Sequence, residues 1–175
     1  MKTIVEQLAK YAEYHRDRRN IVTHFIGIPM IVLAVQVLLA RPVWMAGPVP
    51  VSAALIASVA AAIYYLRLDR SLGVLMTIAL VLGLVAAHAA ALQTTTTWLW
   101  IGIGLFVVGW VIQFVGHIYE GRKPAFVDDI IGLIIGPLFV AAELMFVLGL
   151  RRELQQAIEE RAGPTRLGRP TATPT

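Results

Sequence analysis

The sequence contains no cysteine and carries little charge. The lack of cysteine excludes a disulfide framework, a thiolate zinc site, an iron–sulfur cluster and a cysteine nucleophile. Charged residues make up 15% of the 175 residues and hydrophobic residues 58%, whereas a soluble domain is about 25% charged and about 45–50% apolar. An ordinary soluble globule is therefore excluded. The formal net charge of +4 indicates basic loops beside anionic lipid rather than a surface that binds nucleic acid.

Long apolar runs make up most of the chain, and a helix needs about 20 such residues to cross a bilayer. The five candidate membrane segments are Ile21–Ala40, Val49–Leu66, Leu72–Leu92, Trp98–Gly116 and Ile130–Leu150. Short amphipathic helices are expected to flank them, at Ile4–Tyr14 along the membrane interface and at Arg151–Arg161. Asn20 is the expected N-cap of the first spanning helix. We expect one membrane-embedded domain, residues 1–162, followed by a disordered tail, residues 163–175.

Lysine and arginine gather in alternate loops, and this pattern predicts the orientation of the chain. The N-terminal stretch and the loops after the second and fourth segments are basic, whereas the other two loops hold Arg41 alone. The basic loops are therefore expected in the cytoplasm. The Arg-rich C-terminus returns there only if the last segment, which contains Gly136 and Pro137, is broken.

The predicted fold is an all-α polytopic membrane bundle. It has four spanning helices plus a broken or re-entrant C-terminal hairpin, with both termini in the cytoplasm. A bacterial inner membrane fits this arrangement, as does the endoplasmic reticulum if the protein is eukaryotic.

The predicted topology brings three of the four histidines to one membrane face. His15 precedes the first segment, His24 lies one turn inside it and His117 ends the fourth, whereas His88 lies near the opposite face. On one continuous helix His15 and His24 would point to opposite sides, so the chain is expected to turn in the polar run between them. Three imidazoles without a thiolate suit zinc, iron, copper or nickel.

One helical stripe at the end of the fourth segment carries further polar groups. Gln113, His117 and Glu120 follow at i, i+4 and i+7, and Asp128 opens the next segment. We expect Gln113, Glu120 and Asp128 to serve catalysis by orienting the ligand imidazoles, or one carboxylate to complete the ligand set. The alternative is structural, with Glu120 paired to Arg122 or Arg19 and Asp128 capping a helix.

Two motifs resemble a known family. They are YHRDRRNIVTHFIGIP at Tyr14–Pro29 and GWVIQFVGHIYEGRKPAFVDD at Gly109–Asp129, followed by IGPLFVAAELMFVLG. Together they resemble the membrane 2-hydroxy fatty acid dioxygenases. The resemblance implies an Fe²⁺-dependent enzyme that uses dioxygen to shorten a 2-hydroxy fatty acid by one carbon, the reaction called α-oxidation. It assigns the metal ligands to His15, His24 and His117.

A fatty acid is expected to enter from the bilayer and to present its carboxylate to basic side chains at the cytoplasmic rim. The four cations expected to bind this carboxylate are Arg18, Arg19, Arg122 and Lys123. Two other functions stay open, namely a zinc-dependent lipid hydrolase on the same three histidines and a small transporter or scaffold without enzymatic activity. A serine hydrolase is not expected, because Ser52, Ser58 and Ser71 lie away from the histidines.

Overall fold

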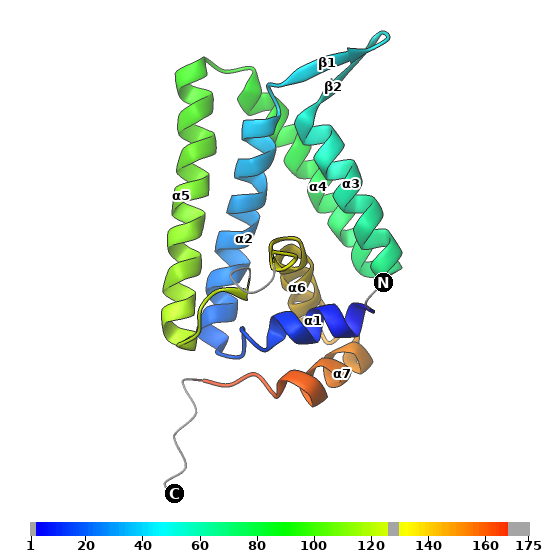
Figure 1. The fold of residues 1–175 in the computed structure, drawn as a ribbon, viewed down its shortest axis with the longest axis vertical. Helices are drawn as coiled ribbons and strands as arrows, with labels where there is room; N and C mark the ends of the chain where they lie inside the picture. Colours follow the sequence, from blue (N-terminus) through cyan, green and yellow to red (C-terminus); the bar gives the residue numbers. More distant parts are fainter. Residues whose placement is uncertain (1–2, 126–129, 168–175) are drawn as a thin grey trace, which may run out of the picture. The chain divides into compact units, whose positions relative to one another are not determined.

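The computed structural model describes residues 3–125 and 130–167, which are mostly helical (Figure 1). The elements in these ranges are α1 (Ile4–Ala12), α2 (Arg18–Leu39), β1 (Val43–Ala46), β2 (Val49–Ser52), α3 (Ala53–Leu68), α4 (Arg70–Ala91), α5 (Thr95–Glu120), α6 (Gly132–Val147) and α7 (Arg152–Ala162). The chain forms two compact units. One consists of Met1–Ile26 with Val111–Thr175, and the other of Gly27–Trp110. The predicted all-α class is confirmed.

Among the described residues, three helices, α2, α4 and α5, are long and apolar enough to cross a membrane. Helices α6 and α7 pass the same test together but are bent by 118°, as in a broken span or a re-entrant segment. This bend confirms the predicted C-terminal hairpin. The predicted position of the break, at Gly136 and Pro137, is wrong. Helix α6 continues through Pro137, and the bend lies between α6 and α7. Helix α3 is shorter than the predicted second segment because residues 49–52 pair with Val43–Ala46 in an antiparallel hairpin.

A polar side chain joins three helices inside the unit Gly27–Trp110. Gln36 of α2 donates through Nε2 to Ser58 Oγ in α3 and to the Leu80 carbonyl in α4, both at 3.0 Å. An alanine-rich cluster packs around Val37 in the same unit. Small side chains and satisfied interhelical hydrogen bonds are what hold helices together where lipid removes the hydrophobic drive for association.

The amphipathic helices α1 and α7 belong to the other unit, where α1 packs against both α6 and α7. Helix α1 begins with a capping box made by Thr3 and Glu6. Its apolar side buries Leu8, and α7 buries Leu154 and Ile158. Both predicted amphipathic helices are present, and these apolar side chains are buried within the protein.

A sharp turn separates α1 from α2 and carries His15, as the spacing of the histidines predicts. Asp17 caps α2, because its Oδ1 accepts the Arg19 N–H at 2.9 Å. The prediction that Asn20 caps this helix is wrong. Asn20 lies in the first turn of α2, where its Nδ2 donates to the Tyr14 carbonyl at 3.2 Å. Asn20 thus lies inside α2, and its side chain ties the helix to the turn that precedes it.

Candidate metal centre

Three buried histidines meet in the unit formed by Met1–Ile26 and Val111–Thr175. The ring centroids of His15 and His24 are 4.4 Å apart, those of His15 and His117 5.0 Å, and those of His24 and His117 5.2 Å. Each ring offers one nitrogen as a ligand atom, and these three atoms lie within 4.8 Å of one another. The turn after α1, the start of α2 and the end of α5 thus bring together residues separated by up to about 100 positions.

Backbone carbonyls fix the tautomers of two of these rings. Nδ1 of His15 lies 2.7 Å from the Tyr11 carbonyl, and Nδ1 of His24 lies 2.8 Å from the Asn20 carbonyl. Because a carbonyl only accepts, each Nδ1 carries the hydrogen and each Nε2 keeps its lone pair. Burial, and then the charge that His24 would carry, lower the pKa of His15 well below its ordinary value. His15 is therefore a neutral imidazole, which is the form in which histidine binds metals.

His117 differs from the other two rings. Its buried Nδ1 has no hydrogen-bond partner in the part of the chain that the structure describes, so this nitrogen is available as a ligand atom. The preceding residue, Gly116, leaves no room for a side chain, since a Cβ there would overlap Thr23 Oγ1. Helix α5 thus approaches α2 closely at the level of the histidines.

This donor set fits a divalent transition metal. Metal–nitrogen bonds of about 2.0–2.1 Å bring two ligand atoms to within about 4.2 Å, so ring movements of less than about 1 Å close the observed separations. His15 Nε2 and His117 Nδ1 are both buried and unpartnered among residues 3–125 and 130–167, a costly state unless another group binds them. Three protein ligands also leave positions open for a substrate.

Glu120 connects the end of α5 to the turn after α1. Its buried carboxylate accepts, through Oε2, the backbone N–H groups of Arg16 at 2.9 Å and Asp17 at 2.7 Å. Asn20 Nδ2 donates to the same oxygen at 3.2 Å, and Arg166 Nη2 donates to Oε1 at 3.2 Å. Both oxygens of Glu120 are thus engaged by protein groups. Glu120 fixes the backbone that follows His15.

A buried cation lies beside the same turn. Arg16 is 2% exposed, donates through Nη1 to the Gly163 carbonyl at 2.9 Å and places Nη2 3.5 Å from Glu143 Oε1. Burial lowers the pKa of Arg16, and the charge of Glu143 opposes this shift. Because a guanidinium keeps its proton in proteins, Arg16 and Glu143 form an ion pair away from bulk water.

The remaining predicted site residues have different positions. Gln113 lies in α5 one turn before His117, is 4% exposed, and its Nε2 has no partner among the residues that the structure describes. Asp128 lies outside those residues. His88 is exposed on α4 in the other unit and does not belong to the histidine group.

The cations predicted to bind a substrate carboxylate are Arg18, Arg19, Arg122 and Lys123. Arg19 makes two bonds to the Asp17 carboxylate, at 2.8 and 3.1 Å, and Arg122 donates to the Glu13 carbonyl at 2.8 Å. Arg18 and Lys123 are exposed. Arg19 and Arg122 thus already bind groups of this chain, and the assignment of the carboxylate to these four residues stays a prediction.

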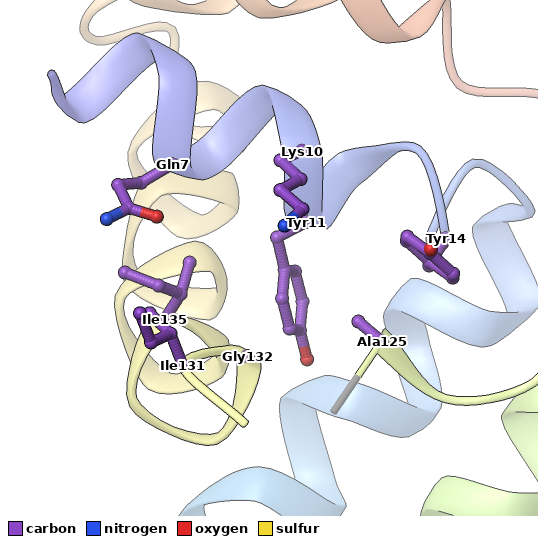
Figure 2. A pocket seen from close by; sticks show the side chains of 8 residues that line it. All are labelled: Gln7, Lys10, Tyr11, Tyr14, Ala125, Ile131, Gly132 and Ile135. Carbon is purple, nitrogen blue, oxygen red and sulfur yellow. The ribbon is translucent and has the colours of Figure 1, made fainter. Parts of the chain in front are cut away.

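A pocket lies beside α1 (Figure 2). The Tyr11 ring stacks on His15, with centroids 4.1 Å apart and planes 5° from parallel. The hydroxyl end of Tyr11 points into the pocket, which Gln7, Lys10 and Ile131 also line (Figure 2). Burial raises the pKa of Tyr11, so the hydroxyl stays protonated and is able to donate. Tyr11 thereby links the pocket to one of the three clustered imidazoles.

Two arginines at this site, Arg16 and Arg166, do not emerge from the sequence pattern. Both lie in basic stretches whose composition is typical of solvent-exposed segments, and Arg166 falls in the predicted disordered tail. A signal for them does exist. Glu120 ends one apolar segment and Glu143 lies inside another, and such carboxylates need a cation or a set of N–H donors when they are buried.

Comparison with known proteins bears out the resemblance carried by the two histidine motifs. The family model described as 2-hydroxy-palmitic acid dioxygenase Mpo1-like matches residues 1–148. The 2-hydroxy-palmitic acid dioxygenase MPO1 of Saccharomyces cerevisiae is 32% identical over 155 residues, which cover 87% of this chain and 86% of the yeast protein. No solved structure matches the chain. The chain therefore belongs to the 2-hydroxy-palmitic acid dioxygenase Mpo1-like family.

Proposed function

We propose that the chain is an iron(II)-dependent membrane dioxygenase that shortens 2-hydroxy fatty acids by one carbon. The observation that carries this proposal is the group of three buried histidines whose ligand atoms lie within 4.8 Å of one another. The name of the yeast relative, a 2-hydroxy-palmitic acid dioxygenase, supports the reaction type and the substrate class. The long apolar helices support a bilayer setting, in which a fatty acid is already dissolved.

The proposal gives each residue of the centre a task. His15, His24 and His117 hold the iron and leave positions open beside it. Bound iron(II) supplies the dioxygen chemistry that cleaves the bond between C1 and C2 of the substrate. Glu120 keeps the turn after α1 in place. Gln113 offers its Nε2 as a donor to a group bound next to His117.

Asp128 stays a candidate for orienting a ligand imidazole in this proposal. The substrate carboxylate meets the basic rim formed by Arg18, Arg19, Arg122 and Lys123, where positive charge offsets its own. The distribution of lysine and arginine favours a cytoplasmic position for this rim and for both termini.

Tyr11 offers two contacts to the proposed function: its hydroxyl points into the pocket, and its ring stacks on His15. Two substitutions test these contacts separately. Tyr11→Phe keeps the stacking on His15 but removes the hydroxyl that points into the pocket. We expect unchanged metal content and a KM for 2-hydroxypalmitate raised about 2- to 13-fold, which corresponds to one hydrogen bond of about 0.5–1.5 kcal/mol. Tyr11→Leu also removes the stacking and is expected to lower metal retention. Steady-state kinetics and metal analysis measure both effects.

The same Tyr→Phe change at Tyr64 in α3 is the control, since Tyr64 belongs to the other unit. An equal rise in KM for Tyr64→Phe, or no change for Tyr11→Phe, would exclude the Tyr11 hydroxyl from substrate binding.

The proposed function is tested by metal analysis of the purified protein together with an oxygen-dependent assay. We expect about one iron per chain after anaerobic reconstitution with Fe²⁺. We also expect conversion of 2-hydroxypalmitate to the acid one carbon shorter only when dioxygen is present. Palmitate, which lacks the 2-hydroxyl group, is the matched control substrate and is expected to remain intact.

Other outcomes would replace this proposal. Bound zinc with turnover in the absence of dioxygen would indicate a lipid hydrolase on the same histidines. A protein that takes up no transition metal and converts neither substrate would indicate a transporter or scaffold.

A further inference from the structure

We infer that Arg166 is a positioning residue for the three-histidine centre. Its segment, Gly163–Arg166, follows α7 and clamps the turn that carries His15 against Glu120. The inference rests on the proposed function in one respect, since the centre to be positioned is a metal centre.

The backbone of Arg166 lies along this turn and bonds to it in both directions. The Arg166 N–H donates to the Arg16 carbonyl at 2.8 Å, and the Arg18 N–H donates to the Arg166 carbonyl at 2.8 Å. These two bonds form a parallel bridge between Asp17 and Arg166. Arg16 Nη1 adds a bond of 2.9 Å to the Gly163 carbonyl. The segment is thus attached by three hydrogen bonds to Arg16 and Arg18, on either side of Asp17.

The side chain of Arg166 binds Glu120, the carboxylate that accepts the N–H groups of the turn. Its Nη2 lies 3.2 Å from Glu120 Oε1, with the carboxylate side chain fully buried and the arginine side chain 36% exposed. A buried carboxylate is costly unless a cation or several donors satisfy it. Arg166 covers the oxygen that the turn itself does not bind, so Oε2 stays directed at the Arg16 and Asp17 N–H groups.

These contacts connect two ligand-bearing segments. Glu120 lies three residues after His117 on α5, and the N–H groups that it accepts belong to the two residues directly after His15. The position of the His15 ring relative to His117 therefore depends on the orientation of this carboxylate. Outer groups that orient a ligating imidazole commonly change metal affinity about 10- to 100-fold when they are lost.

The match to the family model covers residues 1–148, so Arg166 lies beyond the matched part. The inference rests on distances and hydrogen bonds to residues that the family model does include.

The test compares the full-length chain with Arg166→Gln, Arg166→Lys and Arg161→Gln. Co²⁺ alone is the probe, because its ligand-field absorption reports both binding and ligand geometry at an imidazole site. We expect Arg166→Gln to weaken Co²⁺ binding about tenfold, the lower end of the range for an outer group. Arg166→Lys keeps a cation for Glu120 and is expected to restore most of the affinity. Arg161→Gln removes the same charge from an exposed position on α7 and is expected to leave binding unchanged.

Hydrogen exchange gives a second measurement that needs no metal. We expect Arg166→Gln to speed exchange at the amides of Arg16 and Asp17, which donate to Glu120. Unchanged cobalt affinity and unchanged exchange would overturn the inference, as would an equal loss in Arg161→Gln or no rescue by lysine. If the unsubstituted chain takes up no Co²⁺, the metal centre itself fails, and with it the assignment of Arg166 as a positioning residue. The exchange data then show only whether the clamp exists.

Discussion

Replacement of His15, His24 or His117 by alanine is expected to abolish metal retention and, with it, oxygen-dependent turnover. Each change removes one of three neutral imidazole nitrogens from a group within 4.8 Å. The expected fall in metal affinity exceeds about 100-fold, because losing even an outer partner of a ligand costs about 10- to 100-fold. Metal analysis after reconstitution with Fe²⁺ measures the loss, and the assay with 2-hydroxypalmitate measures its consequence.

The matched control is His88→Ala in α4. His88 is exposed and belongs to the other unit, so this variant is expected to retain its metal. Metal loss in His88→Ala, or full metal content in His117→Ala, would overturn the ligand set.

Loss of a buried ring also leaves a cavity, which lowers stability by itself. His117→Gln keeps the volume and a polar end, so it separates the two causes. A stable His117→Gln variant without metal identifies the imidazole as a ligand rather than a packing element.

The helices were predictable because their signal is local. A run of about 20 apolar residues leaves few alternatives in a bilayer, so the predicted segment Leu72–Leu92 and the observed α4 differ by no more than two residues at each end. The histidine group followed from the same topology. His15 and His117 lie next to the ends of α2 and α5, so the direction of those helices alone brought them to one face.

The parts that could not be predicted depend on contacts between distant residues. Asp17 rather than Asn20 caps α2, because the helix begins at Arg18, ahead of the apolar run. The Asn20 amide instead binds Glu120, a hundred positions later. Arg166 pairs with Glu120 through a segment whose composition is typical of disorder. No local pattern distinguishes these arginines and amides from solvent-exposed ones. Their roles arise only when the turn, α5 and the segment after α7 pack together.

Replacement of Glu120 by alanine is expected to be the most destabilising substitution outside the histidines. It leaves the N–H groups of Arg16 and Asp17 without their acceptor and Arg166 without its anion. Breaking a buried charge arrangement of this kind costs about 3–5 kcal/mol. Chemical unfolding of the detergent-solubilised protein measures the loss of stability. Glu120→Gln keeps an oxygen acceptor for the turn and is expected to cost about 1–2 kcal/mol, the difference between charged and neutral hydrogen bonds.

The same pair of variants decides between two roles for Glu120. If the carboxylate were a fourth metal ligand, Glu120→Gln would lose its metal as completely as His117→Ala does, because a neutral amide is a poor ligand for Fe²⁺. In the structure both carboxylate oxygens bind protein groups, and the group of potential ligands among the described residues holds the three histidines without Glu120. We therefore expect Glu120→Gln to keep its iron, with affinity lowered about tenfold as for an outer group. Iron content near that of the unsubstituted protein, measured beside an iron-free His117→Ala, identifies Glu120 as the residue that positions the His15 turn.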